Sequence, residues 1–213
     1  MAMRLHELHA AMIHTPLVLL PAAAMVDFSA ATTGDARRAA LGRRLWWLGV
    51  GAAGLAGVAG LAASQEIKAD DSHAEDMIWL HGAGNFAILL GGVGLALWRT
   101  FRRPSVAEAT IGLGASALAM YTAYLGGEVV YSHGVGVRAM PGMAPTGVRR
   151  SPRLLSREAP ATFLRDAVGG FVWLVRRTAQ ALAGRRRVDR RAFAIGASSE
   201  RDASAEAAYE REF

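Results

Sequence analysis

Apolar residues in this chain are gathered into long blocks that are separated by short polar stretches. The blocks run over residues 10–31, 45–63, 77–98 and 106–131. Each is close to the ~20 residues that an α-helix needs to cross a hydrocarbon core of ~30 Å. The pattern therefore predicts an all-α protein: a four-transmembrane-helix bundle over residues 8–138, with short loops between the helices.

The C-terminal part follows a different pattern. Residues 139–160 are rich in proline, glycine and serine, which predicts a linker. Residues 161–184 have apolar positions at helical spacing, but their uninterrupted apolar run is too short to span a bilayer. We expect an amphipathic helix on the membrane surface there, followed by a charged, disordered segment over residues 185–213.

The composition agrees with a membrane protein and excludes the kinds of site that need cysteine. Hydrophobic residues make up 52% of the chain, with a mean hydropathy of +0.21, and there is no cysteine. Disulfides, thiolate metal sites and cysteine nucleophiles are therefore excluded. Residues 1–138 contain as many acidic as basic side chains, so the formal charge of +6 belongs to the basic tail. Anionic lipid is the expected partner of that tail, and no nucleic acid is expected.

The charges of the short loops predict the orientation. Arginines cluster between the first and second blocks and between the third and fourth blocks, whereas residues 64–76 carry five acidic side chains against one lysine. Basic loops favour the cytoplasmic side. We therefore expect a multi-pass protein of the bacterial inner membrane with both termini on the periplasmic face, and a first block that is retained rather than cleaved as a signal peptide.

Polar residues within the spans are the candidate functional groups. His14 and His81 lie at matched depth in the first and third predicted helices, which are diagonal neighbours in an up-down bundle. Such a pair can ligate a b-type haem from both sides, with Asn85, one turn after His81, in a supporting role. His6, His9 and His73 fall outside the predicted spans and are interpreted as solvated. Asp27 is expected to pair with Arg37 or Arg38.

Two other interpretations remain open at this point. His14, His81 and His133 supply three imidazoles, enough for a zinc or copper site. The histidines can also serve as plain hydrogen-bonding groups in a scaffold or small-ligand binder, and the glycine rows of the second and third blocks fit close helix packing. No phosphate-binding loop, nucleophile elbow or carboxylate pair is present. We expect a binding or electron-transfer subunit rather than an enzyme on its own.

Three stretches resemble a bacterial integral-membrane family catalogued as domain of unknown function 2231. They are "LGGEVVYSHGVGV" at the end of the fourth block, "IHTPLVLLP" around His14 and Pro21, and "LHGAGN" around His81 and Asn85. The resemblance covers about residues 8–138. The chain departs from the family pattern at Leu19, where a second histidine is common, and at Ser64 or Gln65, where an acid is common.

The family resemblance implies a helical arrangement similar to that of membrane cytochromes with histidine-ligated haems. Some relatives are joined to Rieske domains, so an iron-sulfur protein is the implied redox partner. In the terminal motif we expect Tyr131 at the membrane interface and His133 aimed back over the pocket of His14 and His81.

Overall fold

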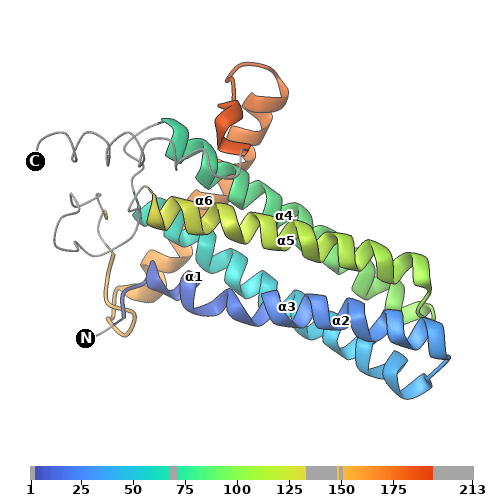
Figure 1. The fold of residues 1–213 in the computed structure, drawn as a ribbon. Coiled ribbons are helices and arrows are strands. Elements are labelled where there is room, and N and C mark those ends of the chain that lie inside the picture. Colours follow the sequence, from blue (N-terminus) through green and yellow to red (C-terminus); the bar gives the residue numbers. More distant parts are fainter. Residues whose placement is uncertain (1–2, 68–71, 133–147, 149–150, 194–213) are drawn as a thin grey trace, which may run out of the picture.

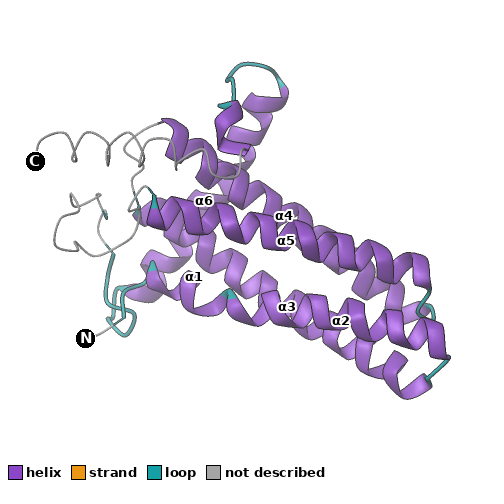
Figure 2. Ribbon diagram, viewed as in Figure 1, coloured by secondary structure: helices purple, strands orange, loops and turns teal. Residues whose placement is uncertain are grey.

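Long α-helices form a bundle, and one further helix packs across it (Figure 1). The computed structural model describes residues 3–67, 72–132, 148 and 151–193. Over these residues the elements are α1 (Glu7–Met12), α2 (His14–Thr33), α3 (Ala36–Glu66), α4 (Ser72–Phe101), α5 (Val106–Tyr131), α6 (Ala159–Leu182) and the 3-10 helix η1 (Arg190–Phe193). Every named element in the described residues is helical, as the all-α prediction requires (Figure 2).

Helices α1 and α2 form one slightly broken rod. Ile13, between them, keeps right-handed helical angles (φ −62°, ψ −27°). Pro16 has no N–H to donate to the carbonyl of Met12 four residues earlier, so one backbone hydrogen bond of the helix is missing at this point. The chain direction is almost unchanged, and the rod ends at Gly34, whose positive φ of 71° suits the left-handed position after a helix.

Short turns join the bundle helices into antiparallel hairpins. The side chain of Asp35 caps α3 by accepting from the N–H groups of Arg37 (2.8 Å) and Arg38 (3.2 Å). Ser105 caps α5 in the same way, accepting from the N–H of Glu108 at 3.2 Å. Helix α2 packs on α3 and α5, and α4 packs on the same two helices. Helices α2 and α4 therefore lie on one diagonal of the bundle.

Three helical segments are long and apolar enough to cross a membrane. They are Glu7–Thr33, Ala36–Glu66 and Ser72–Phe101. These segments correspond to the first three predicted spans. The fourth predicted span corresponds to α5, which does not meet the same criterion but presents large apolar side chains such as Ile111 and Met120 to the outside of the bundle.

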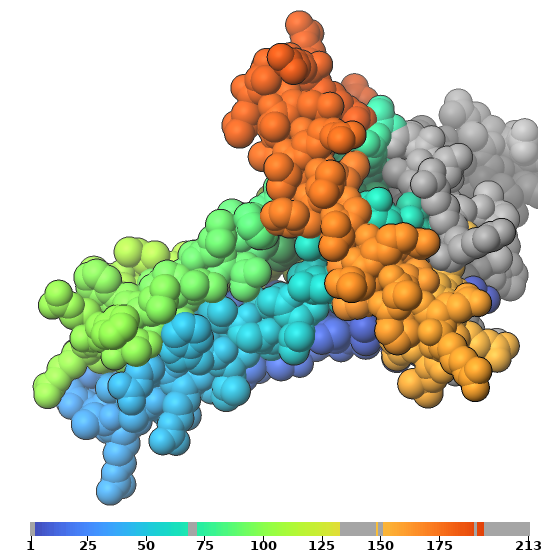
Figure 3. Space-filling model, turned by 180° about the vertical axis from the view of Figure 1, so that it is seen from behind, coloured from blue at the N-terminus to red at the C-terminus, as the bar shows by residue number. Residues whose placement is uncertain are grey.

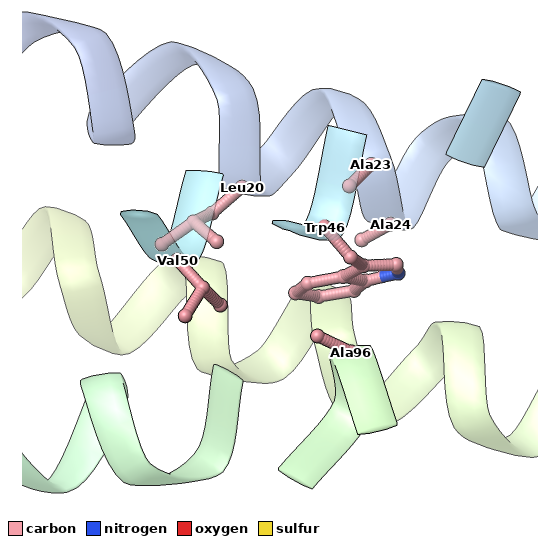
Figure 4. Close-up of a cluster of buried hydrophobic side chains, with 6 residues drawn as sticks. All are labelled: Leu20, Ala23, Ala24, Trp46, Val50 and Ala96. Carbon is pink, nitrogen blue, oxygen red and sulfur yellow. The ribbon is translucent and has the colours of Figure 1, made fainter. Parts of the chain in front are cut away.

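Small residues and one large aromatic residue make the central core (Figure 4). The indole of Trp46 is 2% exposed and lies among Leu20, Ala24, Val50 and Ala96 in a cluster contributed by α2, α3 and α4. A Cβ atom on Gly112 of α5 would come within 2.9 Å of this indole. The bundle therefore closes around Trp46 because the facing position has no side chain.

Helix α6 packs across the outside of α3 and α4 at the end of the bundle that holds α1 (Figure 3). A Cβ atom on Gly170 would lie 2.1 Å from the carbonyl oxygen of Leu61, so α6 and α3 touch backbone to backbone. The segment before α6 is also attached: the N–H of Leu5 donates to the carbonyl of Pro152 at 3.1 Å. The segment predicted as an amphipathic helix over 161–184 thus lies against the bundle. Residues 133–138 at the end of the predicted membrane domain, 139–147 and 149–150 of the predicted linker, and 194–213 of the predicted disordered tail lie outside the described part.

Candidate functional site

Two histidines from separate helices meet near the end of the bundle that carries α6. The imidazole of His9 on α1 and that of His81 on α4 have ring centroids 5.9 Å apart, with planes at 83°. Both residues keep intermediate exposure. The pair joins the α1–α3 side of the bundle to the α4–α5 side, across the same diagonal on which α2 and α4 lie.

Each ring is held by a backbone carbonyl. The Nδ1 atom of His9 lies 2.8 Å from the carbonyl oxygen of Ala56, and the Nδ1 atom of His81 lies 2.7 Å from that of Thr122. A carbonyl oxygen only accepts hydrogen bonds, so both Nδ1 atoms carry the proton and donate it. In a neutral imidazole this tautomer leaves the lone pair on Nε2. Each ring is thus held in a fixed orientation, with a lone pair on its Nε2 atom.

Polar groups beside His81 extend the site into α5. The side-chain amide of Asn85 donates to the backbone carbonyl of His81 at 2.8 Å, and its nitrogen lies 3.3 Å and 3.4 Å from the two ring nitrogens. The hydroxyl of Thr122 donates to the Asn85 side-chain oxygen at 3.2 Å. The helix-face relation predicted between His81 and Asn85 is therefore a direct contact in the structure.

His14 does not join this site. Its side chain is exposed on the outside of the bundle, and the partner of His81 is His9. The structure therefore places His9, and not His14 as expected, beside His81. Positions five residues apart on a helix are rotated by about 140°, so His9 and His14 point to different faces of the α1–α2 rod.

The other predicted site residues lie at the end of α5 or beyond the described chain. Tyr131 is the last residue of α5 and is 80% exposed. Beside it on the same helix, Glu128, which is not among the predicted site residues, accepts a hydrogen bond from the hydroxyl of Ser132 at 2.8 Å. His133 lies outside the described residues. Among the residues that the structure does describe, no group of three or more histidine, aspartate or glutamate side chains is arranged to hold a metal ion.

Sequence reasoning missed His9 because it set the start of the first span at residue 10. The helix begins at Glu7, which brings His9 into the rod. A usable signal is present in the facing helix: Ala56 and Gly60 are small residues one turn apart, and a Cβ atom on Gly60 would come within 2.9 Å of the His9 ring. Such a gap in a helix surface accommodates an aromatic ring from a neighbour.

The family described as "Predicted membrane protein (DUF2231)" matches residues 5–139, which is more than half of the chain. The chain belongs to the DUF2231 family. The matched region contains α1 to α5, and therefore His9, His81 and Asn85, whereas α6 lies beyond it. Searches of curated proteins and of solved structures gave no match.

A second buried polar cluster lies at the opposite end of the DUF2231 region. Asp27 is 0% exposed and accepts hydrogen bonds from the indole of Trp46 at 2.8 Å and from Arg99 at 2.6 Å and 3.0 Å. The expected pairing of Asp27 with Arg37 or Arg38 is therefore wrong. Asp35, rather than Asp27, binds the N–H groups of those arginines, and Asp27 serves the interior of the bundle.

Outside the DUF2231 region, α6 is attached to the start of α4 by charged groups. Arg177 lies 2.5 Å from Asp76 in a buried pair, with its guanidinium over the Trp79 ring at 4.7 Å. After α6, Asp189 contacts His73 at 3.1 Å. Hydrogen bonds from the backbone N–H of Arg191 and from His73 lower the pKa of Asp189, so its carboxylate stays ionised at a lower pH than that of a free aspartate.

Proposed function

We propose that this DUF2231 protein is a membrane electron-transfer subunit in which His9 and His81 hold one b-type haem. The observation that carries the proposal is the histidine pair itself. Metal–imidazole bonds are about 2.0–2.1 Å long, so two imidazoles on opposite sides of one metal atom have centroids roughly 6 Å apart. The spacing of 5.9 Å between His9 and His81 fits that requirement.

The number of donors favours haem over a bare metal ion. Zinc sites take three or four protein ligands, and the contact between His9 and His81 brings two imidazoles together. Haem iron takes four nitrogens from the porphyrin and needs only two from the protein, and its reduction and oxidation supply the one-electron chemistry. The carbonyls of Ala56 and Thr122 fix the tautomer of the two histidines, and Asn85 limits the rotation of the His81 ring.

A non-redox scaffold or small-ligand binder is the second candidate. It is favoured by the close fit of backbone around each ring: Cβ atoms on Gly60 and Gly126 would lie 2.9 Å from His9 and 2.7 Å from His81. In that case the histidines are hydrogen-bonding groups that hold α1 to α3 and α4 to α5. Copper or zinc bound by the pair is the metal-ion version of this second candidate.

The orientation that we propose follows the basic turns. Helix α5 serves as the fourth span, and the arginines near residues 37–44 and 99–103 mark the cytoplasmic side of the bacterial inner membrane. The N-terminus, α6 and the histidine pair then lie near the periplasmic side. Electrons are exchanged there with a soluble or tethered partner, for which an iron-sulfur protein is our candidate.

We further propose that α6 lies in the membrane interface, with the bilayer as its partner. Its exposed apolar side chains share one side of the helix: Leu164, Val168, Phe171, Val172, Val175 and Leu182. Phe171 contacts the outward-facing Phe86 on α4, with ring centroids 6.2 Å apart. On another side Gly169 faces Gln65 near the end of α3. The apolar side thus continues the lipid-facing surface of α4, and Arg165 and Arg176 are exposed toward headgroups.

The test of the redox proposal is the absorbance of the detergent-purified protein, expressed with ample haem and compared in the oxidised and dithionite-reduced states. A haem b spectrum is the expected result. A colourless protein that contains no iron would contradict the proposal and favour the scaffold. Elemental analysis that finds copper or zinc without a haem band would instead assign the histidine pair to a metal ion.

A further inference from the structure

The buried cluster at the arginine-rich end of the bundle contains a second carboxylate. Glu108, in the first turn of α5, is 5% exposed, and its Oε2 atom lies 3.9 Å from Nε of Arg99. That guanidinium is already engaged. It binds both oxygens of Asp27 and the backbone carbonyls of Ala39 and Arg102.

Neither oxygen of the Glu108 side chain has a hydrogen-bond partner among the described residues. The spacing of Ser105 and Glu108 is that of a capping box, in which the glutamate accepts from the backbone N–H of the serine. Ser105 caps α5, and its N–H is close enough to the Glu108 carboxyl group to favour the ionised form, but neither Glu108 oxygen has a hydrogen bond of normal geometry. The capping box is therefore incomplete.

The charges of the cluster do not balance when every group is ionised. Arg99 supplies one positive charge, whereas Asp27 and Glu108 supply two negative charges. A buried charge without a partner is strongly unfavourable, and the common outcome is that the group takes up a proton. Arg99 and the N-terminal end of α5 favour the ionised form of Glu108, whereas burial and the negative charge of Asp27 favour the protonated form.

We propose that Glu108 is a reversible proton-binding site. The charged groups that face it are Asp27 on α2 and Arg99 on α4, which bind each other. Glu108 lies in the first turn of α5, close in sequence to the exposed residues 101–103, so we place the exchange of this proton with water at the arginine-rich end. The site is independent of the histidine pair, which lies at the other end of the bundle.

Infrared difference spectroscopy of the purified full-length protein between acid and alkaline pH tests this proposal. The carbonyl stretch of a protonated carboxyl group is well separated from the bands of a carboxylate. We expect a component of the buried-carboxyl band that is present at the acid end, disappears as the pH rises and is missing in Glu108→Gln. The exposed Glu158 gives the matched control, since Glu158→Gln must leave the band unchanged.

Asp27→Asn provides a second variant that does not depend on the first. Removing the negative charge of Asp27 frees Arg99 to pair with Glu108, so the band should disappear at a lower pH than in the wild type. The proposal is overturned if the wild type has no such band at any pH, if the band survives in Glu108→Gln, or if Asp27→Asn leaves its pH dependence unchanged.

Discussion

At the scale of single residues, the histidine pair depends on glycine as well as on imidazole. His9 lies against Gly60, and His81 lies against Gly126, at distances that leave no room for a Cβ atom. The two rings reach the carbonyls of Ala56 and Thr122 because Gly60 and Gly126 have no side chains in their way. A glycine in a helix interior usually lowers stability, so its use at both contacts indicates that packing of the rings outweighs helix propensity.

Gly126→Ala tests this dependence. The new methyl group would push the His81 ring away from the Thr122 carbonyl, and we expect a loss of about 1–3 kcal/mol in the free energy of unfolding in detergent. Gly127 is the matched control, because nothing lies within 4 Å of its Cβ position. Gly127→Ala should be neutral or stabilising by up to about 1 kcal/mol. Equal effects of the two variants would show that the ring contact is not a constraint.

The sequence identified one half of the pair. His81 and Asn85 were predictable because both lie inside an apolar block and four residues apart on one helix face. His9 was not predictable from hydropathy, because it lies in the first turns of the rod, where Glu7 and His6 end the apolar block. Choosing between His9 and His14 requires knowledge of which face of the rod meets the bundle, and that depends on packing with α3.

At the scale of elements, the apolar blocks predicted the helices but not their full lengths. Helix α3 begins at Ala36, nine residues before the block over 45–63, because Asp35 caps it there. Its first turns carry arginines, which extend into water or headgroups while the backbone remains helical. Capping signals and short turns fix such boundaries, whereas hydropathy reports only the part of a helix that faces lipid or core.

If α6 lies in the membrane interface, its apolar side faces lipid and its arginine-bearing side faces water. This difference can be tested. The chain has no cysteine, so a single introduced thiol can be followed with a water-soluble maleimide. Val175 and Arg176 are adjacent and both exposed, but they lie about 100° apart around the helix. In proteoliposomes we expect Val175→Cys to react several-fold more slowly than Arg176→Cys. Equal rates would mean that the apolar side of α6 is in water.

At the scale of the whole molecule, the basic C-terminal part is bound to acidic groups of the same chain. Arg177 pairs with Asp76, 101 positions away, and Arg186 pairs with Glu75, 111 positions away. Charge counting predicted a basic tail that needs an anionic partner, and part of that partner is the start of α4. Pairs so distant in sequence are set by the fold, so composition alone could not identify them.

The Asp76–Arg177 and Glu75–Arg186 ion pairs are expected to contribute different amounts to the stability of α6 docking. Asp76 and Arg177 are buried, with side-chain exposures of 5% and 2%, whereas those of Glu75 and Arg186 are 35% and 38%. Asp76→Asn leaves Arg177 without its partner, which should lower the stability of α6 docking by about 3–5 kcal/mol. Glu75→Gln should cost about 0–1 kcal/mol. Hydrogen exchange of the α6 amides measures both, and similar protection in the two variants would contradict this ranking.

The proposed topology predicts which ends of the molecule face which compartment. Arg103, in the turn before α5, and Leu155, before α6, are exposed at opposite ends of the bundle. With a membrane-impermeant maleimide, Leu155→Cys should react in cells with a permeabilised outer membrane, and Arg103→Cys only after the inner membrane is opened. The reverse pattern would place the histidine pair on the cytoplasmic side.

If this protein binds a b-type haem, His9 and His81 would be the residues that hold it. The dithionite-reduced minus oxidised absorbance spectrum of the wild type, His9→Ala, His81→Ala and His14→Ala, all purified in the same detergent, decides whether they do. We predict a haem b spectrum in the wild type and in His14→Ala, because His14 is exposed on the outside of the bundle, and its loss in the other two variants. A spectrum that survives in His9→Ala or His81→Ala, or a wild type without haem, would contradict the proposal.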